Sequence, residues 1–389
     1  MFLFLIGFIM LYGGMHAYAF FRLCHAFTTK PTTALIMGWM ILMTVAPLLV
    51  RLFEKTGNER AALWVAWPGY IWMGCLFIFC SALLTTDILR FAAWVANRLY
   101  GVAIPGCLTA AITCEIALFL ALIASGYALY AARNIRTDHI MVTTAKLPPS
   151  SPGIRIVQIS DVHLGLLSRE FRLESVLRAV RAAHPDILVS TGDLVDGRLS
   201  REDVISRLNR MSAMIAAVPT KSGKFAVTGN HEYYAGLEQA LEFTRKAGFT
   251  VLRNQSITLP EGITITGVDD PAGQRLGIPV ASPPESDLVQ SASDQQFRLL
   301  LKHRPVISAT SDGHVDLQLS GHVHKGQIFP FNLLVRLIFP IPCGTTVTGH
   351  NSTIHVSRGS GTWGPPMRLL APPEVTVIDI LPPGLAIQK

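Results

Sequence analysis

The sequence predicts an N-terminal α-helical multi-pass membrane domain followed by an α/β domain. Two observations predict this order. Half of the 389 residues are hydrophobic and the mean hydropathy is +0.39, but the excess apolarity is concentrated in the N-terminal part. After residue 153, short β-branched runs alternate with helical patterns. We expect the membrane domain over residues 1–142, a Pro/Ser/Gly linker over 143–153 and the α/β domain over 154–389.

Four segments are apolar over about the 20 residues that a helix needs to cross about 30 Å of hydrocarbon. They are residues 2–21, 33–50, 62–84 and 107–132. The first has neither a basic start nor a small-residue cleavage site, so we expect a retained anchor. Between the third and fourth, Arg90 and Arg98 stand among apolar residues. This pattern favours an interfacial helix over residues 89–106, with a fifth, poorer span as the alternative.

The distribution of charge bears on partners and on topology. Residues 1–150 carry ten Lys/Arg and five Asp/Glu, which is +5 of the net +7. The high pI therefore belongs to the membrane part, and we expect no nucleic-acid partner. With four spans, six basic residues lie on the side of the C-terminal domain and four on the other. This count favours the inner cell membrane with that domain on the cytoplasmic side, and a fifth span would reverse the side.

Glu115 lies inside the fourth apolar segment. An ionisable group within a membrane span is a functional candidate by default. The alternative is a neutral carboxyl that packs against a threonine or the backbone of a neighbouring helix.

Polar residues follow nearly every strand-like run of the α/β domain. The runs are "IRIVQIS", "DILVSTG", "KFAVTG", "FRLLLK" and "VDLQLS". In layered α/β folds, ligand and catalytic groups collect in the loops at the carboxyl ends of the strands, so we expect these residues to converge. They are Asp161, His163, Asp193, Asp196, Asn230, His231, His303, His322 and His324.

The side chains in this set predict a metal centre. Carboxylates, imidazoles and an amide form the mixed oxygen and nitrogen shell that suits divalent transition ions. Asp161 and His163 are two residues apart, so both can point to one side of an extended strand. Glycines precede three of the loops, where a residue without Cβ permits a sharp turn. They are Gly192, Gly229 and Gly321.

The ordered motifs "DVH", "GDLVD", "GNHE", "LKHRP" and "GHVH" resemble the calcineurin-like metallophosphoesterase superfamily over about residues 154–380. The "GHVHKGQ" context and the tail "VSRGSGTWGPPMRLLAPPEVTVIDI" resemble its membrane-associated phosphodiesterase branch, similar to YkuE-like and YaeI-like proteins. That branch includes enzymes that cleave UDP-2,3-diacylglucosamine in lipid A synthesis. The resemblance implies a four-layer αββα sandwich and two divalent metal ions, with manganese first and zinc or iron as alternatives.

The resemblance also implies a role for each residue of the set. His231 would stand over the phosphate, oriented by Asp196, and protonate or stabilise the leaving oxygen. Asp193 would bridge the two ions, since a carboxylate has two oxygens. Asp161, His163 and His324 would hold the first ion, and Asn230, His303 and His322 would hold the second.

Three basic residues are candidate substrate ligands. Lys325 stands where the branch commonly has glycine, and it could bind a substrate phosphate or point to solvent. Arg358 and Arg368 could bind phosphate through planar, bidentate donors. Structural ion pairs with Asp or Glu are the alternative for both arginines.

A run of apolar residues, 328–339, follows directly after the last motif. It could be an ordinary core strand. The other interpretation is that it dips into the bilayer surface, with Arg336 at the level of the headgroups, so that a lipid-linked phosphate reaches the metals.

These features predict a membrane-bound phosphoesterase that hydrolyses a phosphodiester or pyrophosphate bond, with a lipid-linked substrate such as UDP-2,3-diacylglucosamine. One alternative is a broad-specificity phosphodiesterase or phosphomonoesterase that is merely anchored in the membrane. Another is a non-catalytic membrane sensor or transporter. The complete set of metal and acid positions in the five motifs counts against the last alternative.

Overall fold

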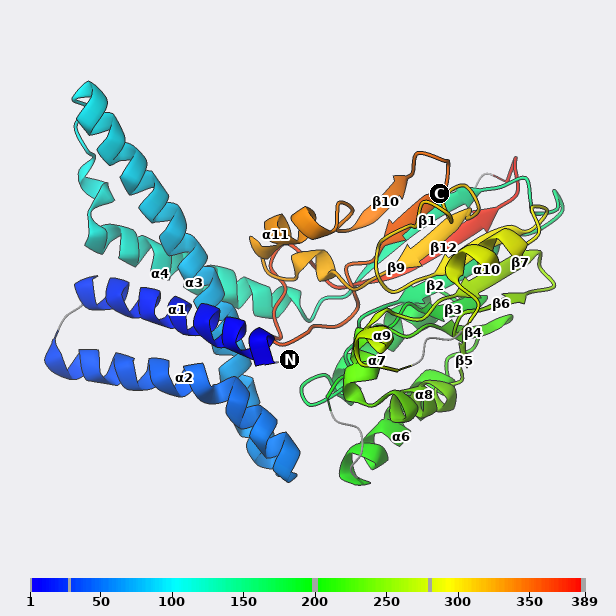
Figure 1. Ribbon diagram of the computed structural model, residues 1–389, viewed down its shortest axis with the longest axis horizontal. Helices are drawn as coiled ribbons and strands as arrows, with labels where there is room; N and C mark the ends of the chain where they lie inside the picture. The colour runs from blue at the N-terminus through cyan, green and yellow to red at the C-terminus, as the bar shows by residue number, and fades with distance from the viewer. Residues whose placement is uncertain (1, 27–28, 198–201, 279–281, 386–389) are drawn as a thin grey trace. The chain divides into compact units, whose positions relative to one another are not determined.

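The computed structural model describes residues 2–26, 29–197, 202–278 and 282–385, and the chain forms two compact units (Figure 1). The first, here called the helical unit, comprises Met1–Tyr130 and two later segments, Ile328–Pro330 and Gly364–Leu369. The second, here called the sheet unit, comprises the remaining residues.

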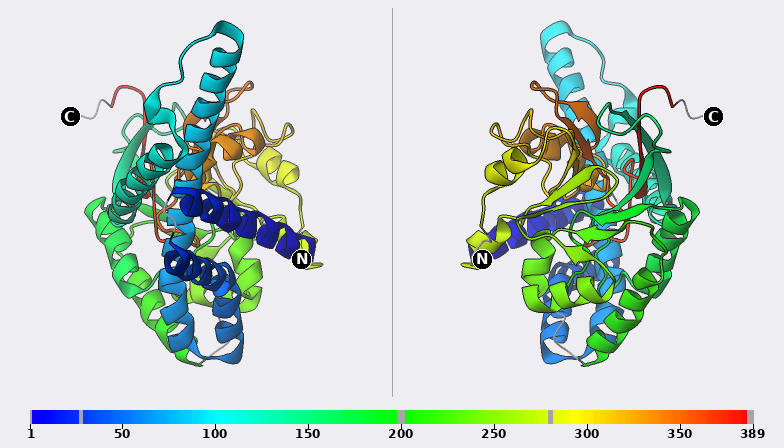
Figure 2. Two further views of the ribbon diagram at one scale, coloured as in Figure 1. Left: turned by 90° about the vertical axis from the view of Figure 1, so that its left-hand side faces the viewer. Right: turned by 90° about the vertical axis from the view of Figure 1, so that its right-hand side faces the viewer.

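The helical unit contains α1 (Phe2–Ala26), α2 (Lys30–Thr56), α3 (Glu59–Tyr100), the short η1 (Gly106–Leu108) and α4 (Ala110–Ala131). Helices α1 and α2 contact α3, and the blue end of the chain can be followed in both views of Figure 2. Over the described residues, α2, α3 and α4 are long and apolar enough to cross a membrane. The first predicted span forms α1, whose first side chains lie outside the described part, and its crossing stays a prediction.

Helix α3 continues into the predicted interfacial segment and ends at Tyr100. Residues 89–100 belong to α3, so they form neither a separate interfacial helix nor a separate fifth span. The positive charge of Arg90, which suggested that the third span ends before it, is compensated. The Arg90 guanidinium lies 3.2 Å from the Asp87 carboxylate and donates to the Leu108 carbonyl. Glu115 is exposed on α4 and does not pack inside the helical unit.

The two late segments complete the core of the helical unit. Ile328 and Met367 belong to the same buried cluster as residues of α1, α3 and α4. The sulfur of Met367 occupies the space that a side chain at Gly74 would need. The Arg368 N–H donates to the Ala128 carbonyl of α4 at 2.9 Å.

The sheet unit contains two six-stranded sheets. In spatial order, the first has β1 (Arg136–Thr143), β12 (Glu374–Leu381), β2 (Ile154–Ile159), β3 (Ile187–Ser190), β4 (Gly223–Ala226) and β5 (Thr250–Val251). The second has β10 (Gly344–Val347), β11 (Thr353–Val356), β9 (Leu317–Ser320), β8 (Phe297–Leu301), β7 (Ile263–Gly267) and β6 (Gln255–Thr258). Strands β2, β3 and β4 are parallel, as are β8 and β9, so each group has its carboxyl ends at one edge.

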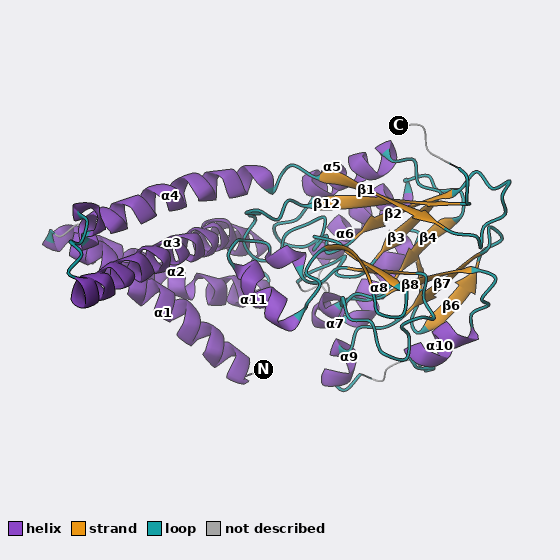
Figure 3. Ribbon diagram, turned by 90° about the horizontal axis from the view of Figure 1, so that it is seen from above, coloured by secondary structure: helices purple, strands orange, loops and turns teal. Residues whose placement is uncertain are grey.

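The layers follow from the alternation of side chains along each strand. Ile156 of β2 lies in the core between the sheets, whereas Val157 faces α5 (Glu170–Ala182) and α6 (Glu202–Ala216). On the other side, Leu300 of β8 packs against Leu288 of α10 (Glu285–Ser291). The order is helix, sheet, sheet, helix, so the predicted αββα sandwich is confirmed. Figure 3 distinguishes the helices and the strands of the chain by colour.

The sheet unit begins earlier than the predicted boundary after residue 142. Strand β1 pairs in parallel with β12, from Arg136 opposite Glu374 to Thr143 opposite Leu381. Residues 144–153 therefore connect two strands of one sheet. The pairing partner of β1 lies near the other end of the chain, so no local sequence pattern predicts the pairing.

The apolar run after the last motif forms a helix, α11 (Phe331–Ile338), so the alternative of a core strand is wrong. Val335 is buried against Val323 and the β11 residues Ile354 and Val356. Most of the other apolar side chains of α11 are exposed. Leu333, Leu334, Leu337 and Ile338 have exposed fractions of 54%, 55%, 82% and 73%.

Candidate metal centre

The predicted polar residues follow the carboxyl ends of five strands. Asp161 and His163 follow β2, Asp193 and Asp196 follow β3, Asn230 and His231 open α7 (Asn230–Ala235) after β4, His303 follows β8, and His322 and His324 follow β9. Three of these strands are parallel neighbours in the first sheet and two in the second. The structure brings the ligand atoms of these loops together in overlapping groups.

The first group is Asp161, His163 and His324, whose ligand atoms lie within 4.8 Å of one another. The Nε2 atoms of His163 and His324 are 3.1 Å apart, and His324 Nε2 is 3.5 Å from Asp161 Oδ1. All three residues are buried. Two imidazole nitrogens and a carboxylate oxygen therefore converge on one point.

The second group is centred on His303. Its Nε2 lies 3.2 Å from each of Asp193 Oδ2, Asn230 Oδ1 and His322 Nδ1. The His303 Nδ1 atom is 2.8 Å from the Thr191 carbonyl, which can only accept, so Nδ1 carries the hydrogen and Nε2 can offer a lone pair. Asp193 Oδ2 is also 3.9 Å from His163 Nε2 of the first group. The Asp193 carboxylate thus lies between the two groups.

These residues fit two divalent ions. Buried imidazole nitrogens that face each other at 3.1 and 3.2 Å need a proton or a cation between their lone pairs. Among the described residues, the Nδ1 atom of buried His163 has no hydrogen-bond partner. Imidazole nitrogen, carboxylate oxygen and amide oxygen together suit a divalent transition ion.

The backbone of the ligand loops is strained. Five non-glycine ligands have a φ of 49–73°, in the left-handed region that such residues rarely adopt. Strain of this kind concentrates at functional sites, where the surrounding structure holds it. The five are Asp161, His163, Asp193, His322 and His324.

Two of the predicted glycines permit close approach between loops. A Cβ at Gly229 would overlap the carboxylate of Asp193, and a Cβ at Gly321 would overlap Ser160 and Asp161. Any side chain at these positions would push the ligand loops apart.

His231 lies beside the ion ligands with its ring held from one side. Its Nδ1 is 2.9 Å from Asp196 Oδ1. Burial acts to lower the pKa of His231, but the carboxylates of Asp193 and Asp196 outweigh burial and raise the pKa to about 9. The rings of Tyr234 and Trp363 flank the imidazole, with centroids 5.5 and 5.9 Å away. The arrangement provides an imidazolium whose Nε2 can donate a proton.

Glu232 is a positioning residue that the sequence reasoning missed. Its buried carboxylate accepts hydrogen bonds from the backbone N–H groups of Asp193, Leu194 and Gly229 at 3.0, 2.7 and 2.7 Å. It thereby ties the loop after β3 to the loop after β4. Burial raises the pKa of Glu232 to about 7. The only signal was its place directly after His231 in "GNHE".

The three predicted substrate ligands have different surroundings. Arg358 forms ion pairs with Asp138 and Glu374 at 2.7 and 2.5 Å, which is the structural alternative. Arg368 is fully buried and belongs to the helical unit. Lys325 is half-buried beside the ligand His324. A phosphate contact by Lys325 or Arg368 stays a prediction.

Comparisons with known proteins show which family the chain resembles. The family model for the calcineurin-like phosphoesterase matches residues 154–326. The chain is 41% identical to a metallophosphoesterase of Aquifex aeolicus over 264 residues, 68% of this chain and 98% of that relative. It is 32% identical to the metallophosphoesterase YkuE of Bacillus subtilis over 66% of this chain and 89% of the relative. It is 29% identical to a transmembrane protein with metallophosphoesterase domain of Danio rerio, over 68% of this chain and 61% of that protein.

Proposed function

The chain belongs to the calcineurin-like metallophosphoesterase family, and on that premise we propose that it hydrolyses a phosphodiester or pyrophosphate bond in a lipid-linked substrate. The family implies a metal-dependent phosphoester hydrolase, which replaces the non-catalytic sensor or transporter considered from the sequence. UDP-2,3-diacylglucosamine is the most concrete candidate substrate. Its hydrolysis would release UMP and leave a lipid monosaccharide phosphate.

The observation that supports a lipid-linked substrate is the exposed apolar face of α11. Four of its eight residues are leucines or isoleucine that are more than half exposed, and only Val335 is buried. A face of this kind is unfavourable in water and favourable at the acyl boundary of a bilayer. The helix begins directly after Ile328–Pro330, a segment of the membrane-type helical unit. Arg336 adds a cation suited to lipid phosphate groups.

Two groups of residues would hold the ions, Asp161, His163 and His324 for one and Asn230, His303 and His322 for the other, with Asp193 shared. We propose manganese, and zinc or iron suit the same atoms. Bound ions would supply an acidified water and offset charge on the phosphoryl oxygens.

His231 would supply the proton for the leaving oxygen. Asp196 holds Nδ1, which fixes the tautomer and aims the ring, so the proton available for transfer is the one on Nε2. The same carboxylate stabilises the imidazolium before transfer, and this keeps the acid charged at neutral pH. Tyr234 and Trp363 limit the approach of water to the ring from two directions.

Three membrane-span candidates and relatives named as transmembrane proteins indicate a membrane protein. We place it in the inner cell membrane with the sheet unit on the cytoplasmic side, which rests on the count of six basic residues against four.

The test is release of UMP from UDP-2,3-diacylglucosamine by the full-length protein in detergent with added Mn²⁺, beside a soluble aryl phosphodiester. We expect cleavage of the lipid substrate that is lost in Asp193→Ala. The double variant Leu334→Ser/Leu337→Ser should lose about tenfold in kcat/KM on the lipid substrate and little on the soluble ester, since it removes apolar surface from α11.

The matched control is Phe171→Ser, which also removes an exposed apolar side chain, from α5. Cleavage of the soluble ester alone, or equal loss on both esters in the α11 variant, would favour the broad-specificity enzyme that is merely anchored.

A further inference from the structure

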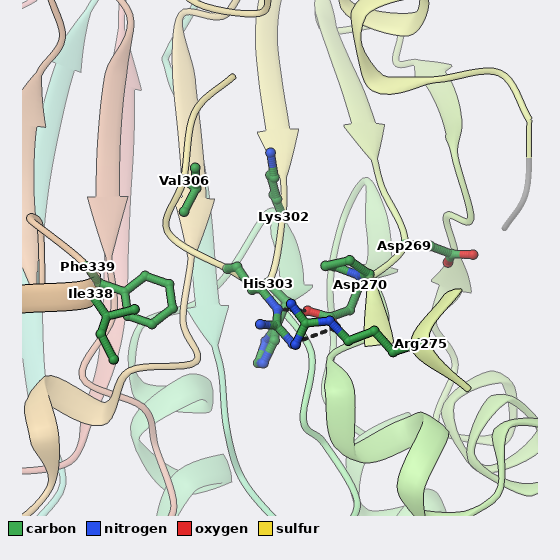
Figure 4. A pocket seen from close by; sticks show the side chains of 10 residues that line it. Asp269, Asp270, Arg275, Lys302, His303, Val306, Ile338 and Phe339 are labelled. Atoms are coloured by element: carbon green, nitrogen blue, oxygen red, sulfur yellow. Dashed lines mark hydrogen bonds and ion pairs between the residues drawn. The ribbon is translucent and has the colours of Figure 1, made fainter. Parts of the chain in front are cut away.

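A hollow of about 410 Å³ opens beside His303 in the sheet unit (Figure 4). Its lining comes from the loops after β7 and β8, from α9 (Ala272–Arg275) and from the end of α11. His303 belongs both to this lining and to the second ligand group. The hollow therefore borders the proposed site.

The acidic side chains of the hollow are already neutralised. Asp270 accepts two hydrogen bonds from the guanidinium of Arg304, at 2.7 and 3.1 Å. Asp269 accepts from Arg253 at 2.7 Å and its side chain is fully buried. The carboxylates thus present no free negative charge to a ligand.

The basic residue whose charge is available to a ligand in the hollow is Arg275. Lys302 is paired with Glu285 at 2.6 Å, whereas the ion pairs found among the described residues do not include Arg275. In Figure 4 its side chain extends from α9 toward Asp270 and His303. A guanidinium in this position has donors for an anion in a planar, bidentate arrangement.

The opposite wall is apolar. Ile338 and Phe339 lie across the hollow from Arg275, with His303 between them (Figure 4). The Phe339 ring centroid is 5.4 Å from that of His322, so this wall also borders the ligand loops. A cation on one side and a ring on the other suit a phosphate that is bonded to an apolar or cyclic group.

We propose that this hollow is a subsite for a second phosphate of the substrate, bound by Arg275, while the phosphate to be cleaved lies at the ions. The inference rests on the proposed phosphoesterase function and deepens it. It makes the protein selective for pyrophosphate-linked substrates over diesters that contain one phosphate.

The experiment compares Arg275→Gln with wild type on a nucleoside diphosphate sugar, which contains two phosphates, and on bis(p-nitrophenyl) phosphate, which contains one. We expect KM for the two-phosphate substrate to rise about tenfold more than KM for the one-phosphate substrate, the effect of one charged hydrogen-bond donor. The value of kcat on the two-phosphate substrate should change less than KM, because Arg275 does not touch the reacting atoms. The control is Arg245→Gln, which changes an exposed arginine of α8 (Leu237–Lys246). It should leave KM for both substrates and kcat unchanged.

A second readout does not depend on turnover. Calorimetry with the full-length, Mn²⁺-loaded protein should show that Arg275→Gln weakens UDP about tenfold more than UMP. Equal weakening of both nucleotides, or of neither, would overturn the subsite. Absence of turnover on every ester, with the selective loss of UDP binding retained, would instead contradict the proposed hydrolysis and leave the subsite standing.

Discussion

Asp193 and Glu374 are both buried carboxylates of the sheet unit, and their side chains are 3% and 1% exposed. Asp193 faces the imidazoles of His303 and His163. Glu374 faces the guanidinium of Arg358, and Arg358 and His355 lower its pKa against the opposing effect of burial. A guanidinium keeps its charge, whereas imidazoles can release their protons to make room for a metal ion. The neighbours of a buried carboxylate, more than its burial, decide whether it serves chemistry or the fold.

The largest effect should come from Asp193→Ala. This change removes the carboxylate shared by the two ligand groups, so kcat should fall by about three orders of magnitude or more. Bound manganese, measured by elemental analysis, should fall with it. The thermal unfolding midpoint of the metal-free protein should fall little. A large drop would mean that Asp193, like Glu374, mainly stabilises the fold.

The next effect should come from His231→Ala, which removes the proposed acid and leaves the ion ligands. We expect kcat to fall about a hundredfold or more, the usual contribution of a positioned acid. Metal content should stay near that of wild type, in contrast to Asp193→Ala. Loss of both activity and metal would mean that His231 acts as a ligand or a structural residue.

Arg358→Ala should lower stability and leave activity unchanged, the opposite of the result expected for Asp193→Ala. It leaves the buried Glu374 without its guanidinium, so the free energy of unfolding should fall by about 3 kcal/mol, as for other broken buried pairs. The kcat of the folded fraction should stay unchanged. Unfolding by urea and kinetics at low temperature measure the two quantities. An increase in KM without a loss of stability would support the phosphate-binding role that the sequence allowed for Arg358.

The smallest effect should come from Asp196→Asn, which keeps the shape of the side chain and removes its charge. Asp196 raises the pKa of His231, so the variant should have a lower pKa. An acid works below its pKa, and the alkaline limb of the kcat profile should therefore move to lower pH. A shift of about one pH unit gives about a tenfold loss above the limb. A limb at the same pH in both proteins would contradict this role of Asp196.

The sequence predicts the grouping of the ligands because the end of each strand can be recognised from the sequence itself. In "IRIVQIS", for example, the apolar run stops just before Asp161 and His163, and parallel strands bring such ends to one edge. The sandwich follows from the same alternation of strands and helices.

Features that depend on distant partners could not be predicted in this way. The role of Arg358 is set by Glu374 and also by Asp138 of β1, which is 220 residues away in the chain. The run that forms α11 is apolar at both strand and helix periods, so its period alone could not predict the helix that the structure shows. The left-handed backbone of the ligands likewise results from loops that close on one another.

The segments Ile328–Pro330 and Gly364–Leu369 impose an order on the assembly of the protein. The ribosome makes α1 to α4 first, yet the space at Gly74 stays unfilled until Met367 has been synthesised. Most of the sheet unit therefore emerges before the helical unit can be completed. A fragment that starts after α4 would expose Ile328 and Met367 to water, because the helices that bury them are missing. Aggregation of such a fragment would therefore result from the missing helices and not from a defect in the fold of the sheet unit.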